Sequence, residues 1–114
     1  MDWKKEKEYF ISIMDNRDEG DYKSNKREGK GIYYFNDGDR YEGDFRGDKK
    51  EGKGVLYYKN GNIYEGDWKD DKMEGKGILY YNNGDIEIGN HLNGKNAGIH
   101  VTIKNNGDIE IINY

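Results

Sequence analysis

Apolar and polar side chains alternate along much of this chain. Tyr64, Gly66 and Trp68 are separated by Glu65 and Asp67. In an extended segment every second residue shares a face, so this period of two is typical of a β-strand. A helix is excluded because glycines every few residues would each cost about 1 kcal/mol relative to alanine. We therefore predict a strand here.

A second, more apolar strand is predicted after a short connection. Gly77, Leu79 and Tyr81 share one of its faces, and Ile78 and Tyr80 share the other. β-Branched and aromatic residues dominate this segment, as pleated surfaces favour. A single-layer sheet cannot bury both faces of such a strand. We expect the uncovered face to contact either the N-terminal segment or another protein.

The strand pair recurs along the chain, and glycines mark a period of 23 residues. The sequences NDGD, KNGN and NNGD separate the copies, and their Asn and Gly residues accept positive φ at little cost. Each repeat is therefore predicted to be one β-hairpin. The glycines fall in four columns, the last of which is broken by His100: Gly20, Gly43, Gly66 and Gly89; Gly29, Gly52, Gly75 and Gly98; Gly38, Gly61, Gly84 and Gly107; Gly31, Gly54 and Gly77.

The period divides the chain into a short N-terminal segment and a repeat domain. We place the repeats at 18–40, 41–63, 64–86 and 87–109, followed by a closing strand at 110–114. Residues 1–17 are interpreted as a cap, either a degenerate strand or a short amphipathic helix. We favour the strand, because Tyr9–Ile13 falls in register with the later YY sequences.

The strand glycines are expected to serve packing. A glycine inside a strand leaves bare backbone, across which a neighbouring aromatic ring can lie. Such an arrangement buries ring faces without a second layer. It suits a chain in which hydrophobic residues make up only 32% and aromatic residues as much as 14%.

Composition narrows the class of protein further. The chain has 114 residues, enough for one domain, and a net charge of −4, which argues against nucleic acid as a partner. It has no cysteine, and no apolar stretch reaches the eighteen or so residues that span a bilayer. The N-terminus lacks the features of a signal peptide. We expect a cytoplasmic protein, with peripheral attachment to a membrane as an alternative.

The pattern YEG-D-[FW]…G-x-G-x-[VIL]-x-Y-x-NG resembles the MORN repeat, whose length is also 23 residues. The resemblance covers residues 18–114. It implies an all-β fold, an elongated, twisted, single-layer antiparallel sheet of consecutive hairpins that forms a trough. It also implies a noncatalytic module that scaffolds partners, mediates dimers or lies near membranes. The trough-side aromatic residues would be Tyr41, Phe45, Tyr58, Tyr64, Trp68 and Tyr81.

Two repeats depart from the family pattern. Asp18 stands in the first tyrosine column, and Glu87, His91 and His100 stand where a tyrosine, an aromatic residue and a glycine are expected. We interpret the changes in the fourth repeat as those of a terminal capping unit, which should present a polar outer face.

The aromatic residues are the predicted partner-binding surface. Tyrosine offers contact area, a hydrogen-bonding tip and a low entropic cost of ordering. The predicted partner is another protein, which includes a second copy of this chain. The candidate contact residues are Tyr34, Tyr41, Phe45, Tyr57, Tyr58, Tyr64, Trp68, Tyr80 and Tyr81.

Columns of lysine support an alternative function. Lysines recur at one offset and again four residues on, which could form a basic edge for anionic phospholipid. The two columns are Lys26, Lys49, Lys72 and Lys95, and Lys30, Lys53 and Lys76. Glutamates and aspartates recur among them, so a solvated edge with little net charge is the favoured interpretation.

Catalysis, a metal and a cofactor are not expected. Nucleophilic catalysis needs a Ser, Thr or Cys beside a His, and the two histidines of this chain both lie in the atypical fourth repeat. His91 and His100 would meet across adjacent strands, but a capping role is favoured over a metal site. No segment matches a calcium-binding or phosphate-binding loop.

Overall fold

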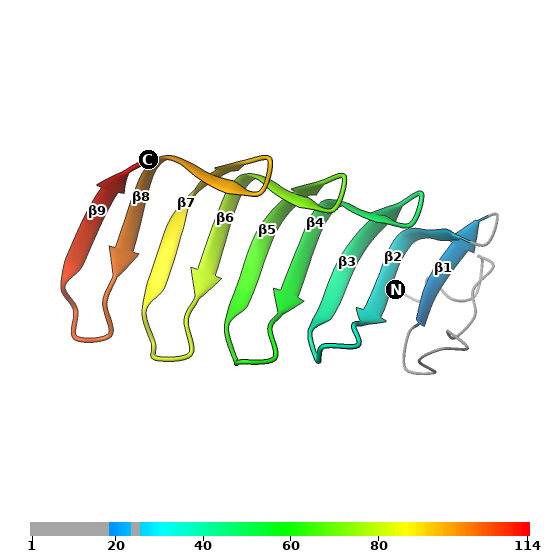
Figure 1. Ribbon diagram of the computed structural model, residues 1–114, viewed down its shortest axis with the longest axis horizontal. Helices are drawn as coiled ribbons and strands as arrows, with labels where there is room; N and C mark the ends of the chain where they lie inside the picture. Colours follow the sequence, from blue (N-terminus) through cyan, green and yellow to red (C-terminus); the bar gives the residue numbers. More distant parts are fainter. Residues whose placement is uncertain (1–18, 24–25) are drawn as a thin grey trace.

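The computed structural model describes residues 19–23 and 26–114, which form one open antiparallel sheet (Figure 1). The described strands follow one another in the sheet in chain order, and each hydrogen-bonds to the next. No helix is present among these residues, and hence none that could span a membrane. The strands are β1 (Glu19–Lys23), β2 (Lys26–Tyr34), β3 (Arg40–Arg46), β4 (Lys49–Tyr57), β5 (Ile63–Lys69), β6 (Lys72–Tyr80), β7 (Ile86–Leu92), β8 (Lys95–Ile103) and β9 (Ile109–Asn113).

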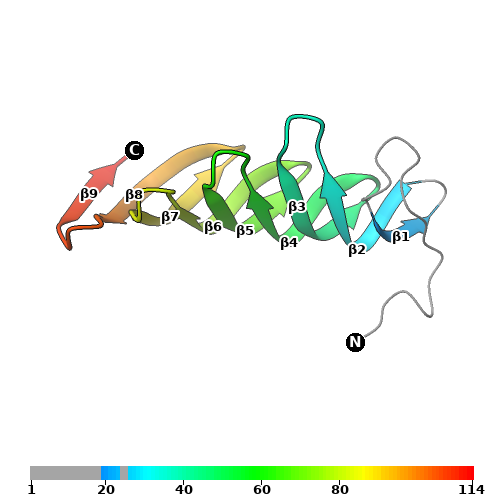
Figure 2. The same cartoon turned by 90° about the horizontal axis from the view of Figure 1, so that it is seen from below.

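The predicted fold class is confirmed: the chain is an elongated, single-layer sheet of consecutive hairpins, 47 × 27 × 24 Å in extent. Figure 2 shows the strands as a single layer, with the turns after β2 and β4 projecting to one side. The closing strand begins at Ile109. The segment 1–17, for which a cap was predicted, lies outside the described residues.

Two kinds of turn alternate along the sheet. Tight two-residue turns join β3 to β4 and β5 to β6, and in each both residues have positive φ, 56° and 73° at Gly47 and Asp48, and 49° and 69° at Asp70 and Asp71. These angles are those of type I′ turns, whose twist matches that of the flanking strands. At the other ends of the strands, wider turns follow β2, β4, β6 and β8. In these a glycine with φ between 93° and 101° donates to the carbonyl three residues earlier, as Gly61 does to Tyr58 at 3.0 Å.

Successive wider turns are also joined to one another by hydrogen bonds. The amide of Asn82 donates to the side-chain oxygen of Asn62 at 2.9 Å, and its side-chain amide donates to the carbonyl of Asn60 at 2.7 Å. Asn105 repeats both bonds one turn further on, to Asp85 and to Asn83. The Asn-rich sequences therefore set the turn geometry and also join successive repeats.

A row of paired glycines crosses the middle of the sheet. Gly43 lies opposite Gly54, and Gly66 lies opposite Gly77. A Cβ atom on Gly54 would lie 2.0 Å from Oη of Tyr41, and one on Gly77 would lie 2.1 Å from Oη of Tyr64. The rings therefore lie on bare backbone, which confirms the packing role expected for these glycines.

The core lies on the face of the sheet that carries these rings, which we call the trough face. Its buried side chains are Tyr41, Phe45, Leu56, Tyr64 and Trp68. Tyr41 and Tyr64 are 0% exposed although the described residues form no second layer over them. Their burial comes from the glycine row beneath them and from neighbouring side chains on the same face.

The glycine row gives a direct test of this packing. We expect Gly54→Ala to lower the free energy of unfolding by about 3 kcal/mol, because its Cβ would overlap a buried ring that cannot move aside. Gly98→Ala is the control, since Gly98 has a φ of +66° and nothing within 4 Å. That change should cost about 1–2 kcal/mol, for the left-handed backbone alone. Urea unfolding followed by circular dichroism measures both, and equal losses would contradict the packing role.

Candidate interaction surfaces

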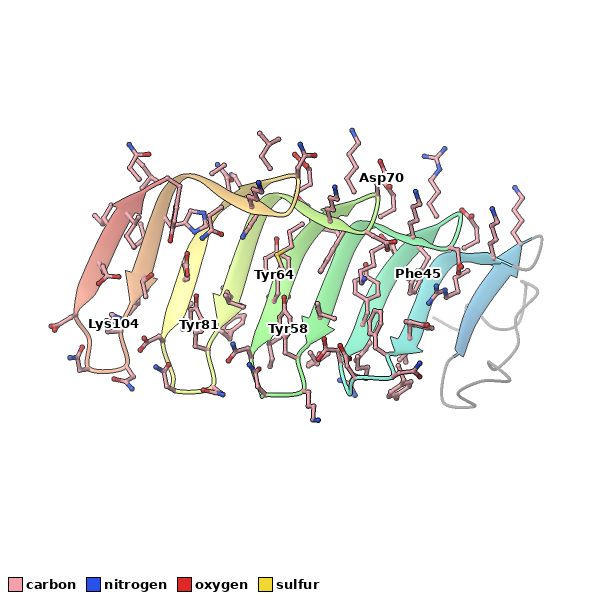
Figure 3. All side chains as sticks on the ribbon, viewed as in Figure 1. Phe45, Tyr58, Tyr64, Asp70, Tyr81 and Lys104 are labelled. Carbon is pink, nitrogen blue, oxygen red and sulfur yellow. The ribbon has the colours of Figure 1, made fainter. Side chains whose placement is uncertain are left out.

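Aromatic rings on the trough face form one continuous ladder. Each ring meets the next edge to face, with centroids 4.9–5.5 Å apart and interplanar angles of 75–88°. Contacts of this geometry contribute about 0.5–1.5 kcal/mol each beyond the area that they bury. Figure 3 shows two of its rings, Phe45 and Tyr64, on the ribbon. In order, this aromatic ladder is Phe45, Tyr41, Trp68, Tyr64, His91, His100 and Tyr114.

Cationic side chains cover the N-terminal half of the ladder. The guanidinium of Arg27 lies 5.0 Å from the ring of Phe45, and Nζ of Lys50 lies 5.3 Å from that of Trp68. The Lys50 side chain is only 13% exposed, and its burial lowers the pKa of the ammonium group. Met73 occupies the same position in the next repeat and packs against the core. The trough is therefore closed by the protein's own side chains.

This closure corrects part of the predicted contact surface. Tyr41, Phe45, Tyr64 and Trp68 are at most 5% exposed, so they form the core and cannot present a surface to a partner. Their polar atoms also point inward: Oη of Tyr41 donates to the carbonyl of Asp44 at 3.0 Å, and Nε1 of Trp68 donates to that of Gly54 at 3.2 Å. Burial raises the pKa of Tyr64 to about 12.

The other five predicted residues are partly exposed and occupy two places. Tyr58 and Tyr81 lie where the trough meets the wider turns (Figure 3), and burial raises the pKa of both phenols. Tyr34, Tyr57 and Tyr80 end the apolar strands and alternate with the trough residues, so they belong to the opposite face, which we call the outward face. Their role in binding remains a prediction.

The outward face changes character along the sheet. Through β5 its central row alternates apolar and acidic residues, because Glu42 pairs with Val55 and Val55 pairs with Glu65. From β6 onward the acidic residues are replaced, and the row continues through Ile78, Ile88, Val101 and Ile111. A neighbouring row also loses its charge, in this case a positive one, because Ile99 takes the position that Lys53 and Lys76 hold in earlier repeats.

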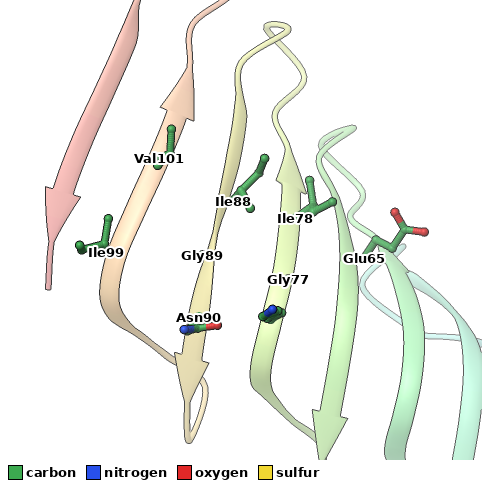
Figure 4. A pocket seen from close by; sticks show the side chains of 9 residues that line it. Glu65, Gly77, Ile78, Ile88, Gly89, Asn90, Ile99 and Val101 are labelled. Atoms are coloured by element: carbon green, nitrogen blue, oxygen red, sulfur yellow. The ribbon is translucent and has the colours of Figure 1, made fainter.

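These replacements create an exposed apolar patch on β6 to β9. Ile88 is 45% exposed, Ile99 61%, Ile109 66% and Ile111 67%. A groove of about 500 Å³ runs through the patch between Ile78 and Ile99, with Glu65 and Lys76 at its border (Figure 4). Exposed apolar patches of this kind often mark interaction sites. We call Ile78, Ile88, Ile99, Val101, Ile103, Ile109 and Ile111 the outward patch.

An uncovered apolar face was predicted at Ile78, but its extension over β7 to β9 was not, and this extension corrects the expectation of a polar cap. The signal was present in two columns. Position 88 carries isoleucine where positions 42 and 65 carry glutamate, and position 99 carries isoleucine where 53 and 76 carry lysine. Comparing the residues that differ between repeats, in addition to those that agree, would have found it.

The lysine columns are partly neutralised within the sheet. Lys30 pairs with Asp44 at 3.0 Å, and Lys53 pairs with Asp67 at 2.5 Å. Glu28 accepts a hydrogen bond from the turn amide of Gly47 at 3.0 Å. Such exposed pairs add little stability, but they reduce the positive charge available to an anionic surface.

The fourth repeat exchanges the two residues that build the core elsewhere. Glu87 stands in the tyrosine column and His100 in the glycine column. The imidazole of His100 lies over Gly89, where a Cβ atom would be 2.4 Å from the ring, and it is 2% exposed. Its Nε2 lies 2.7 Å from the carbonyl of Asn90, in the column of the carbonyl that accepts from Tyr41. The imidazole thus replaces the phenol from the opposite strand.

His91 and His100 do meet across β7 and β8, with ring centroids 5.4 Å apart. In the part of the chain that the structure describes, no three His, Cys, Asp or Glu residues are grouped so that they could hold a metal ion. Both ring nitrogens of His100 already contact protein oxygens. These two histidines extend the aromatic ladder.

A family model of the MORN repeat matches this chain at residues 19–40, 41–63 and 64–86. The three matched segments adjoin one another and together span more than half of the chain. The search of curated proteins finds no match.

Because Glu87 and His100 together replace a tyrosine and a glycine, we expect strong coupling between positions 87 and 100 in the free energy of unfolding. Glu87→Tyr alone would place two rings in one space, and His100→Gly alone would leave a cavity, so each should cost about 2–4 kcal/mol. The double variant recreates the tyrosine-over-glycine packing of the preceding repeats and should regain most of that loss. Urea unfolding of the four proteins measures the coupling. The exchange would be contradicted if the double variant lost as much free energy of unfolding as the two single variants added together.

Proposed function

Because the chain belongs to the MORN repeat family, whose repeats form non-enzymatic modules for contacts with proteins or membranes, we propose that it is a noncatalytic protein-binding module. The observation that carries the proposal is the outward patch. It is the place where the repeat pattern of the outward face is broken: Ile88, Ile99 and Ile111 stand where earlier repeats carry a glutamate or a lysine.

Charge favours a protein over an anionic membrane as the partner. A surface that binds anionic lipid needs an excess of lysine or arginine, whereas two lysines of the outward face are paired with aspartates and the chain as a whole carries a net charge of −4. The outward patch itself contains isoleucine and valine and is bordered by both Glu65 and Lys76. Such an apolar surface with a mixed polar rim is typical of a protein interface.

We propose a second copy of this chain as the partner. A two-fold interface brings the same surface of both subunits together, and the outward patch is suited to this because its exposed side chains are all aliphatic. Sheet faces rich in β-branched residues pack on one another about 10 Å apart. In such a dimer the exposed isoleucines of each chain would cover those of the other, and the charged outward face of β2 to β5 would lie outside the contact.

The test is the molar mass in solution. Light scattering behind size exclusion should give a mass approaching twice 13.3 kDa at high concentration, and the mass should persist in high salt because apolar contacts are not screened. A monomer at every concentration and salt would overturn self-association. Retention on anionic vesicles that is lost in high salt would favour the membrane alternative.

The repeats supply matched variants for this test. Ile88→Glu with Ile99→Lys restores the residues found at these positions in earlier repeats, so it should place two charges in the middle of the outward patch, abolish the dimer and leave the fold intact. Tyr80→Ser should weaken the dimer several-fold, because Tyr80 lies at the edge of the patch. Tyr34→Ser is the control, in the same column but on β2. Equal effects of the two tyrosine changes would contradict the location of the interface.

A further inference from the structure

Glu87 and His100 form a buried pair whose hydrogen bonds require a bound proton, and the rest of the core has no such requirement. Nδ1 of His100 lies 2.6 Å from Oε2 of Glu87, and Nε2 lies 2.7 Å from the carbonyl oxygen of Asn90. Oη of Tyr81 donates to the other carboxylate oxygen of Glu87 at 2.6 Å. The two side chains are 2% and 12% exposed, so water has little access to them.

These contacts determine how many protons the pair holds. A carbonyl oxygen only accepts hydrogen bonds, so Nε2 of His100 must carry a hydrogen atom. Nδ1 faces a carboxylate, and two acceptors at 2.6 Å would repel each other unless a proton lies between them. The proton belongs to His100 as an imidazolium or to Glu87 as a carboxylic acid. In either case the pair holds one proton more than ionised Glu and neutral His would.

We propose that above about pH 6.5 the fourth repeat takes up one proton when it folds, and that the Glu87–His100 pair thereby makes its stability depend on pH in the neutral and mildly alkaline range. The two earlier repeats, 41–63 and 64–86, have a tyrosine and a glycine at these positions and place no such demand on protons.

The groups around the pair do not supply the missing proton. His91 on β7 is the nearest titratable ring, and burial together with the charge of His100 lowers its pKa. Asp85 in the turn before β7 pairs with Lys104 at 3.6 Å. Titratable groups from adjoining elements also include Tyr64, Tyr81, Glu110 and Tyr114, and burial raises the pKa of Tyr64 and of Tyr81.

The sign of the pH dependence follows from proton counting. In an unfolded chain His titrates near pH 6.5 and Glu near 4.3, so above about pH 6.5 the unfolded pair holds no extra proton and the folded pair holds one. The unfolding equilibrium constant should then rise up to tenfold per pH unit as the pH increases. Between these two values the counts are equal, so this pair contributes no slope.

His91 acts in the opposite direction. Because its pKa is lowered in the folded protein, the unfolded chain binds its proton first as the pH falls below about 6.5. The stability that depends on neutral His91 is therefore lost on the acid side. Together the two histidines place the highest stability of the fourth repeat near pH 6.5, with losses on both sides.

Glu87→Gln is the decisive variant, because it keeps every hydrogen bond but removes the need for the proton. The new amide would donate to Nδ1 of a neutral His100 and accept from Tyr81, while Nε2 still donates to Asn90. The experiment is urea unfolding from pH 6 to pH 9. We expect the unfolding constant of the native chain to rise relative to that of Glu87→Gln by up to tenfold per unit above pH 6.5. Comparison with the variant cancels the titrating groups that do not contact the pair, and His91, which does, acts below about pH 6.5.

Nuclear magnetic resonance of the His100 ring gives a second readout that does not depend on unfolding. At pH 8 the native chain should show hydrogen on both ring nitrogens, or hydrogen on Nε2 with a protonated Glu87, and Glu87→Gln should show a neutral ring. The proposal would be overturned if the unfolding constants of the two proteins changed with pH in the same way. It would also be overturned by a neutral His100 beside an ionised Glu87.

Discussion

The fold depends on one contact, an aromatic ring lying on paired glycines. Tyr41 and Tyr64 are fully buried in a sheet that has no second layer. This is possible because the backbone beneath each ring carries no Cβ atom, so the ring approaches closely enough to lose its water. The rings then support Phe45 and Trp68 edge to face. A chain with 32% hydrophobic residues could not fill an ordinary core between two layers, and the glycine row replaces the second layer.

The sequence was sufficient for the fold because its determinants are local and repeated. Alternation with a period of two predicts strands, Asn and Gly at fixed offsets predict the turns, and the period of 23 residues predicts that each hairpin follows the last. Depth of burial was harder to predict. Tyr41 and Tyr57 are both strand tyrosines, yet one is buried and the other partly exposed. The difference arises because Tyr41 lies on the trough face between the glycine row and side chains such as Lys50, whereas Tyr57 lies on the outward face, with the guanidinium of Arg40 4.1 Å from its ring.

The candidate site was missed for a related reason. A repeat is recognised by the positions that agree, and these are the residues that maintain the fold. Ile88 and Ile99 differ from their counterparts at outward-facing positions where the fold imposes no requirement. In a repeat protein such differences are therefore the first place to look for function. The same comparison explains why four of the nine predicted aromatic residues are buried: those that match the family pattern best, Tyr64 and Trp68 among them, are needed for packing.

The fourth repeat shows how the two faces of a strand can change independently. On β7 and β8, the trough face replaces tyrosine over glycine with His100 over Gly89 and keeps the hydrogen bond to the equivalent carbonyl. The outward face of the same two strands replaces charged residues with isoleucine. Because side chains alternate between faces, neither set of changes disturbs the other. They are nevertheless linked through the backbone they share: any condition that weakens the Glu87–His100 pair loosens the strands that present Ile88 and Val101. A dimer formed through the outward patch would therefore be weakened as the pH rises, although the Glu87–His100 pair lies on the opposite face of the sheet.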